Sequence, residues 1–471
     1  MSAVRHRDCE YGGSLSAGRS SLRPMRAGRY QIRSNVMLAF IVGSFALIAV
    51  SCGGDESARS AGSAGADGSL WASSDATAPL SRLPLAARDA SPSTTSLVAT
   101  GHQPPPVRPT TEPTSSTDGS PAAAPTVVST AASSTLAPPS GRVTMAWSGD
   151  VLAHRAINRG ALQPDGTYNY APMFANVASL VSSVDLAICH LESPVGPNGE
   201  VIVEPERIAV AASIGVALAS AGYDRCSTAS NHSLNGGVSG VEATIDALAA
   251  AGLGQSGMAS SADEVLPAIL EINGVRVAHL AYAYGFDGDR APAGEEWRAN
   301  LIDPAQILSD AQAERARGAE VVVVSLHWGS TRAVQATAKQ RRIAEVITAS
   351  GAIDIIVGHH AHVLQPIEQV NGVWVVWGLG NHLSNHPTSS EWPVSTQDGA
   401  IVTIAVQRRP DGTIVVEQPV VYPTWCDREH GWVIRLTTEA DDPNLSGAVR
   451  DELRKSQKRT AELLGWFLAV P

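Results

Sequence analysis

The sequence predicts an α/β fold with mixed sheets, and two observations carry this prediction. Runs of β-branched and apolar residues alternate with helical patterns up to residue 360, as in VVVVSLHW at 321–328. Such runs are typical of strands that are buried on both faces, and their alternation with helices is typical of an α/β core. In addition, Asn-Gly or Asp-Gly pairs at 273–274, 371–372 and 411–412 mark hairpins, which add antiparallel strands to the sheets.

The N-terminal segment has the pattern of a targeting signal, and we expect it to lie outside the fold. Five arginines between 19 and 33 precede the apolar run VMLAFIVGSFALIAV, which leads into Ser51 and Cys52. This run is shorter than a usual membrane span, so residues 1–52 are predicted to be a secretory signal. Its ending resembles a bacterial lipoprotein signal with a lipid anchor on Cys52, and the alternative is an uncleaved signal anchor. Both place the folded part outside the cytoplasmic membrane, anchored to its outer side.

Composition separates a linker from the folded part. Residues 53–141 are dominated by Ser, Ala, Pro, Thr and Gly, and they offer almost nothing to bury, so a disordered linker is predicted. Residues 142–436 are long enough for one large domain, and 437–471 contain an amphipathic helix that is expected to pack on it. The net charge of −11 gives no support for binding nucleic acid.

The elements expected along the domain follow from periodicity and from cap and turn residues. Asp303 with Pro304 is a helix start signal, and Gly222 and Gly252 are stop signals. Strands are predicted at 143–150, 185–192, 225–230, 267–272, 275–283, 321–328 and 353–358. Helices are predicted at 172–184, 213–222, 238–252, 305–318, 338–351 and 447–468.

Polar residues gather where these strands end. Six of the 13 histidines lie between 321 and 386, and Asp150, Glu192 and Asn231 follow earlier strands. Ligands of open α/β sheets bind at the carboxyl ends of strands, and imidazole, carboxylate and amide groups are ligands for divalent metals. For any single histidine a core position is the better interpretation, as for His279 inside a hairpin strand. For the whole set a metal site is the better interpretation.

At this point a family resemblance can be stated. The stretches SGDVL, DLAICHLESPVG, AGYDRCSTASNHSLNGG, VVSLHWG and GHHAHVLQPIEQVNGVWVVWGLGNH resemble, in this order, the CapA-type capsule-synthesis (poly-γ-glutamate) family. That family is itself similar to calcineurin-like metallophosphoesterases. The resemblance implies a four-layer αββα sandwich with one or two divalent metal ions, Mn, Zn or Fe. It implies metal ligands at Asp150, Glu192, Asn231, His232, His327, His360 and His362, and catalytic roles for His232 and His190.

Several positions depart from the pattern of that family. The Asp-x-His motif of true metallophosphoesterases is absent, because Val151 and Leu152 follow Asp150. His190 and Ser230 stand where the family usually has Asn, and Asn235 stands in place of an Asp. Lost carboxylates are thus partly offset by added imidazoles, which indicates either a different metal preference or a weakened site.

Two functions follow as hypotheses. The first is a surface-anchored, phosphoesterase-like hydrolase of capsule or exopolymer biosynthesis, acting on an anionic exopolymer or a phosphoester substrate. The alternative is a non-catalytic polymer-binding or export subunit beside a membrane-bound synthetase.

Asp150 and Asn231 also have plain structural interpretations, as a helix cap and a turn residue. A Cys189–Cys226 disulfide is permitted by an exported location but is not indicated by the sequence.

Overall fold

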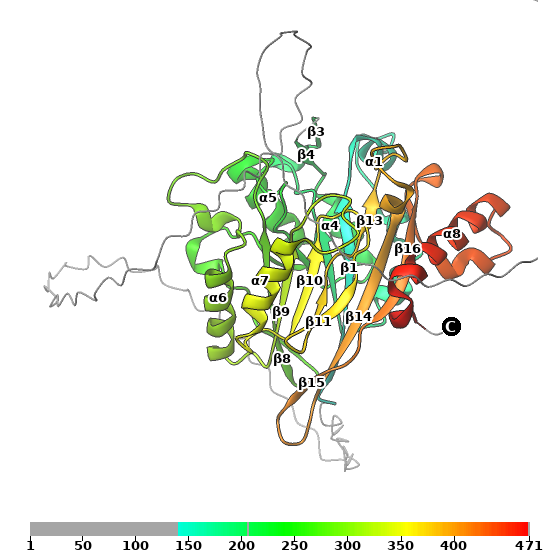
Figure 1. The fold of residues 1–471 in the computed structure, drawn as a ribbon. Coiled ribbons are helices and arrows are strands. Elements are labelled where there is room, and N and C mark those ends of the chain that lie inside the picture. Colours follow the sequence, from blue (N-terminus) through cyan, green and yellow to red (C-terminus); the bar gives the residue numbers. More distant parts are fainter. Residues whose placement is uncertain (1–139, 205–206, 470–471) are drawn as a thin grey trace, which may run out of the picture. The chain divides into compact units, whose positions relative to one another are not determined.

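The computed structural model describes residues 140–204 and 207–469, so the predicted signal and nearly all of the predicted linker lie outside the described residues. The described part is an α/β structure with two mixed sheets (Figure 1). None of the helices in these two ranges is long and apolar enough to cross a membrane.

The larger sheet has nine strands in the order β17-β16-β14-β1-β2-β5-β6, with β13 also paired to β1 and β15 to β14. Its strands are β1 (Arg142–Leu152), β2 (Leu186–Leu191), β5 (Arg225–Ser227), β6 (Gly254–Ser256), β13 (Asn381–Ser384), β14 (Asp398–Arg408), β15 (Ile414–Val416), β16 (Val420–Asp427) and β17 (Val433–Leu436). The central pairs β1–β2 and β2–β5 are parallel, whereas β14, β16 and β17 are antiparallel.

The second sheet has six strands in the order β11-β12-β10-β9-β8-β7. They are β7 (Leu270–Ile272), β8 (Val275–Ala283), β9 (Val321–His327), β10 (Ile355–His359), β11 (Ile367–Val370) and β12 (Val373–Val376). The hairpins predicted at Asn273-Gly274 and Asn371-Gly372 are confirmed, with positive φ at all four residues. A separate two-stranded ribbon joins β3 (Ile202–Val203) to β4 (Ile208–Ala209).

The two sheets pack face to face between layers of helices. On β9, Val321 and Val323 face the core between the sheets, whereas Val322 and Val324 face helices α6 and α7. The larger sheet is covered on its other face by the helices from α1 to α5. The helices are α1 (Arg155–Ala161), α2 (Ala171–Phe174), α3 (Ala178–Val181), α4 (Ser213–Ser220), α5 (Gly237–Ala250), α6 (Pro304–Ala316), α7 (Ala338–Thr348) and α8 (Gly447–Leu464). The order of layers is therefore helix, sheet, sheet, helix.

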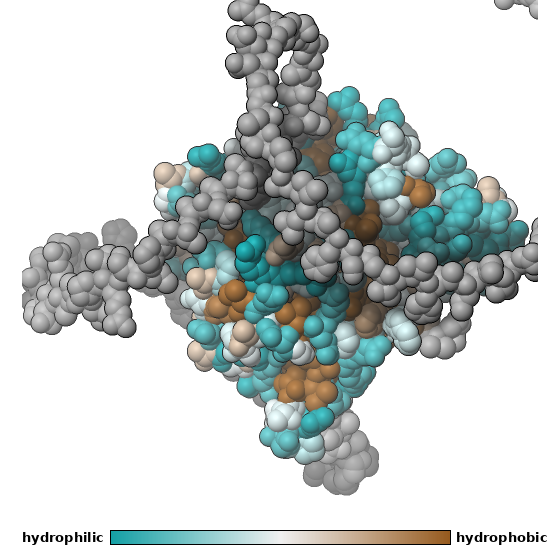
Figure 2. Space-filling view, in the orientation of Figure 1, coloured by the Kyte–Doolittle hydropathy of each residue, from teal (hydrophilic) through white to brown (hydrophobic). Residues whose placement is uncertain are grey.

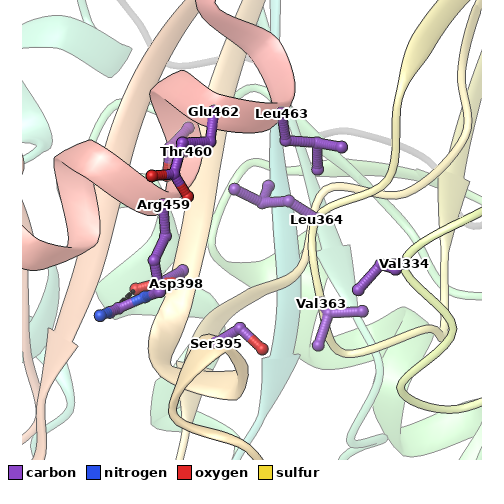
Figure 3. Close-up of a pocket in the computed structure, with 9 residues that line it drawn as sticks. All are labelled: Val334, Val363, Leu364, Ser395, Asp398, Arg459, Thr460, Glu462 and Leu463. Carbon is purple, nitrogen blue, oxygen red and sulfur yellow. Dashed lines mark hydrogen bonds and ion pairs between the residues drawn. The ribbon is translucent and has the colours of Figure 1, made fainter. Parts of the chain in front are cut away.

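Helix α8 packs on the nine-stranded sheet by one apolar stripe and one ion pair. Val449 and Leu453 pack with Trp425 of β16. The Arg459 guanidinium binds the buried Asp398 carboxylate through two hydrogen bonds of 2.6 and 2.7 Å (Figure 3). Figure 2 shows that the surface over α8, at the right of the view, is mostly hydrophilic, as expected for an amphipathic helix.

Two local features differ from the sequence prediction. The helix expected at 172–184 is broken into α2 and α3, because the chain between them tightens into bonds from Val177 N to Phe174 O and from Ala178 N to Ala175 O. Helix α1 was not predicted. Asp150 lies inside β1, as the strand predicted at 143–150 requires, and the alternative interpretation as a helix cap is wrong.

A disulfide joins Cys189 to Cys226, which the sequence only permitted. These residues are direct partners in the parallel pair β2–β5, with Cα atoms 4.4 Å apart. That separation suits a disulfide, and it depends on strand register, which sequence spacing does not reveal.

Candidate metal centre

Strand register brings the predicted site residues to one rim of the two sheets. β1 pairs with β2 so that Asp150 lies opposite His190, and Glu192 follows the end of β2 directly. In the other sheet, β10 pairs with β9 so that His359 lies opposite His327. Each pair is parallel, so its two carboxyl ends lie at one edge of their own sheet. The edges of the two sheets meet where Asp150 Oδ1 lies 3.3 Å from His359 Nδ1.

The backbone turns sharply after β10. His360 and His362 have φ angles of 86° and 56°, a left-handed conformation that costs a non-glycine residue about 1–2 kcal/mol. This turn brings the ring of His360 to 4.7 Å from that of His327, and His362 Nδ1 to 3.2 Å from Asp150 Oδ2. Strain of this kind persists where the surrounding structure holds it, and it is frequent at functional sites.

Six buried residues form two adjacent groups of possible ligands. Within each group the ligand atoms lie within 4.8 Å of one another; the groups are Asp150, His190 and His327, and Glu192, His360 and His362. His190 Nε2 lies 2.9 Å from His327 Nδ1 in the first group. Glu192 connects the groups, because its Oε1 is 3.8 Å from both His327 Nε2 and His362 Nε2.

The donor atoms fit a divalent cation. Both Glu192 carboxylate oxygens and His360 Nδ1 are buried, and they have no hydrogen-bond partner among the described residues. A buried carboxylate without hydrogen bonds is costly unless a cation compensates it. Mixed carboxylate and imidazole donors are the ligands of Mn, Fe and Zn. Asp150, Glu192, His327, His360 and His362 would hold such an ion.

Asn231 and His232 lie at the side of this cluster. Asn231 Oδ1 is 2.7 Å from His327 Nε2, close enough to share one ion with it. His232 is half-buried, its Nδ1 is 2.8 Å from Asn235 Oδ1, and its side chain lines the cleft described next.

A cleft of about 540 Å³ opens onto the cluster. Its lining includes His232, His360 and His362, together with Arg155 and Trp392. His190 is not among the lining residues; it is 1% exposed, it bonds to His327, and its ring stacks on that of His359. The position of His190 therefore suits a ligand or a supporting residue better than direct contact with a substrate.

Comparison with known proteins identifies the family. A profile described as "Bacterial capsule synthesis protein PGA_cap" matches residues 144–386, just over half of the chain. The chain belongs to this family. The match covers every residue of the two ligand groups.

Three relatives show how the PGA_cap chain compares with characterised sequences. "PGA biosynthesis protein CapA" of Bacillus subtilis is 31% identical over 191 residues, which are 40% of this chain and 48% of the relative. "Capsule biosynthesis protein CapA" of Bacillus anthracis is 26% identical, covering 59% and 66%. A "probable polyglutamine synthesis accessory protein" of Mycobacterium tuberculosis is 24% identical, covering 50% and 64%. The PGA_cap chain thus spans less than two thirds of the length of each.

Two solved structures align with most of this chain at low similarity. The NAD nucleotidase of Haemophilus influenzae aligns with a TM-score of 0.40 at 14% identity, covering 70% of this chain and 64% of that one. The calcineurin-like phosphoesterase YfkN of Bacillus subtilis aligns with a TM-score of 0.38 at 15% identity, covering 69% and 99%. The family assignment rests on the sequence match, and these similarities add nothing to it.

Burial and mutual proximity shift the pKa values of the PGA_cap cluster in opposite directions. Burial lowers the pKa of His190 and His327 well below the usual value, and it lowers that of His360 to about 3. Burial would also lower the pKa of His362, but the Glu192 and Asp150 carboxylates outweigh it and raise this pKa to about 9. Burial raises the pKa of Glu192 to about 8. Most imidazoles here are therefore neutral at pH 7, as metal ligands must be.

These shifts predict how the metal-free protein responds to pH. His362 and Glu192 both bind protons more tightly in the folded than in the unfolded state, so stability falls as pH rises from about 6.5 to about 9. The histidines with lowered pKa contribute a change only below about pH 6.5. Urea unfolding of the full chain in a chelator should therefore give a smaller free energy of unfolding at pH 9 than at 6.5. Equal or rising stability over this range would contradict the prediction.

Several residues at the site were missed or undervalued by the sequence analysis. His359 was not among the ligands that the resemblance implied, but its Nδ1 lies 3.3 Å from Asp150 Oδ1. His386 stacks on Trp392 at 3.8 Å and lies 4.7 Å from the His362 ring; its place in the histidine-rich stretch was the available signal. Asp287, hydrogen-bonded to Asn231, had no spacing signal at all. His382 instead bonds Tyr223, and His279 bonds Ser325.

Proposed function

We propose that this chain is a metal-dependent, phosphoesterase-like hydrolase of capsule or exopolymer biosynthesis. The observation that carries the proposal is the buried Glu192 carboxylate, which has no hydrogen-bond partner among the described residues and lies 3.8 Å from the imidazoles of His327 and His362. A protein that needed this cluster only for stability would gain by replacing the carboxylate with an apolar group. Retention of the charge therefore supports a bound cation.

Each residue of the cluster has a proposed role around such an ion. Asp150, Glu192, His327, His360 and His362 would hold it, with Asn231 and His190 as further donors. When bound, a divalent metal supplies positive charge that stabilises the transition state of phosphoester hydrolysis. His232 lines the cleft and bonds Asn235 through Nδ1, which leaves Nε2 as the group that can accept or release a proton there.

The sequence and the relatives support a proposed substrate class and location. The names of two relatives refer to capsule or PGA biosynthesis, which supports an anionic exopolymer, or a phosphoester linked to its assembly, as the substrate. The signal-like segment ending at Cys52 supports a lipid anchor on the outer side of the cytoplasmic membrane, where the chain would work beside a membrane-bound synthetase.

The proposed function predicts that metal binding and hydrolysis are lost and regained together. The purified full chain should hold at least one Mn, Fe or Zn ion by elemental analysis, and it should hydrolyse bis-(p-nitrophenyl) phosphate. Chelation should abolish turnover, and added Mn²⁺ should restore it.

The outcomes separate the two candidate functions. If the purified chain held no stoichiometric metal, the proposed metal centre would be refuted. Metal binding without turnover of any phosphodiester would favour the alternative, a non-catalytic polymer-binding or export subunit. One observation favours the non-catalytic alternative. Ser230 and Asn235 stand where the family usually has Asn and Asp.

A further inference from the structure

Two side-chain amides at the site are each held by an aspartate from the same loop. The loop of residues 284–290 follows β8, and it supplies Asp287 and Asp289. Asn231 Nδ2 donates to Asp287 Oδ2 at 2.6 Å, and Asn235 Nδ2 donates to Asp289 Oδ2 at 3.1 Å. An ionised carboxylate only accepts hydrogen bonds, so in both pairs the amide nitrogen must face the aspartate.

Each amide then presents its oxygen to an imidazole. Asn231 Oδ1 lies 2.7 Å from His327 Nε2, and Asn235 Oδ1 lies 2.8 Å from His232 Nδ1. The backbone N–H of Ile208 also donates to Asn235 Oδ1, at 2.9 Å, which independently identifies that atom as the oxygen. His232 must therefore donate from Nδ1, so its other nitrogen, Nε2, carries the lone pair.

The loop is shaped to hold these two aspartates. Asp289 N donates to Phe286 O across a turn in which Asp287 and Gly288 both have positive φ, 47° and 95°. Asp-Gly is the dipeptide that such turns favour. The Tyr284 hydroxyl donates to the other oxygen of Asp287 at 2.9 Å, and Tyr284 N bonds the carbonyl of His327 at the end of β9. The carboxylates are thus tied to the same strand end as the site.

We propose that the loop of residues 284–290 is a positioning element, in which Asp287 and Asp289 hold the amides of Asn231 and Asn235 with their oxygens toward His327 and His232. The inference rests on the proposed metal-dependent function. It adds that a segment outside the ligand strands sets two things. Asp287 orients the possible metal donor Asn231, and Asp289, through Asn235, sets which nitrogen of His232 carries the proton. Neither aspartate belongs to the two ligand groups, and both act through the amides that they hold, so both are proposed as positioning residues.

The test of Asp287 uses two variants with different predicted outcomes. Asp287→Gly removes the carboxylate without backbone strain, because glycine adopts a φ of 47° freely. It should weaken Mn²⁺ binding by about ten- to a hundredfold, the range for loss of an outer hydrogen-bond partner of a metal ligand. Asp287→Asn keeps an oxygen that can accept the same bond from Asn231, and it tolerates the same φ, so it should restore most of the affinity.

A charge-matched control is Glu271→Gln, which neutralises an exposed carboxylate on β7 and should leave affinity unchanged. Calorimetric titration of the full chain with Mn²⁺ measures all four proteins. Asp287→Gly matching the control would overturn the proposal. Asp287→Asn as weak as Asp287→Gly would overturn it too, since charge rather than the hydrogen bond would then matter.

A second measurement remains informative if the proposed function fails. Imidazole ¹⁵N NMR of the metal-free chain should show His232 with its proton on Nδ1, and Asp289→Ala should introduce the other tautomer. Wild-type protein that binds Mn²⁺ without turnover would refute the hydrolase but leave the affinity and NMR tests in force. His232 with its proton on Nε2 in the wild type, or an unchanged spectrum in Asp289→Ala, would refute the positioning element itself.

Discussion

Replacing Glu192 with glutamine is expected to abolish metal binding and at the same time to stabilise the metal-free protein. The side chain keeps its shape but loses a buried charge that has no hydrogen-bond partner within the described ranges. Removing such a group should raise the free energy of unfolding by about 1–3 kcal/mol at pH 9, where the carboxyl is ionised. Mn²⁺ affinity should fall more than the roughly hundredfold limit for an outer-sphere change, because a ligand that connects both groups is lost.

The opposite signs of the two effects make this variant diagnostic. A residue kept for packing loses stability when it is changed, whereas a residue kept for function often gains it. His279→Gln is the matched control, since His279 is a buried histidine that bonds Ser325 and belongs to neither ligand group. It should leave the metal affinity unchanged. If Glu192→Gln bound Mn²⁺ as tightly as the wild type, Glu192 could not be a ligand.

Replacing Arg459 with methionine is expected to lower the free energy of unfolding by more than the roughly 1 kcal/mol of an exposed pair, and by up to about 3–5 kcal/mol, the range for a fully buried one, because Asp398 is 3% and Arg459 25% exposed. Asp398 is almost fully buried on β14, and Arg459 of α8 neutralises it through two hydrogen bonds (Figure 3). Without the guanidinium the carboxylate is left buried and unpaired. Urea unfolding of the full chain at pH 7 measures the loss.

Two comparisons separate the ion pair from the helix itself. Lys458→Met removes a neighbouring cation of α8 whose pair with Glu462 is 3.9 Å long and exposed, and it should change stability by less than about 1 kcal/mol. Asp398→Asn combined with Arg459→Met should recover part of the loss, because no uncompensated charge remains. A loss in Arg459→Met no larger than that in Lys458→Met would show that the pair does not hold α8.

The residues at the strand ends are the part of the site that the sequence predicted. Asp150, Glu192, His327, His360 and His362 were assigned to one rim because each follows a buried apolar strand, and the structure brings all five together. A shared site requires His327 and His360 to point into the same region. Their rings lie 4.7 Å apart, so this requirement is met. Strand direction accounts for the grouping within each sheet, whereas the packing of the two sheets brings the groups together.

Asp287 and His359 show where the same reasoning stopped. Asp287 reaches Asn231 across 56 residues of sequence, from a loop whose position depends on the packing of β8 against β9. His359 is the last residue of β10, and only the register with β9 and the approach of β1 place it against Asp150. No periodicity in the sequence encodes such a contact.

The sequence by itself determined the α/β class, the hairpins, most of the strands and helices, and the residues at the strand ends, because these depend on local periodicity and turn chemistry. Only the tertiary structure decided the Cys189–Cys226 disulfide, the burial of His190 beneath the cleft, and the orientation of the two amides by the loop of residues 284–290. Each of these depends on register between strands or on packing between distant segments. Such relations arise from burial of the shared core, and a single chain read in order does not contain them.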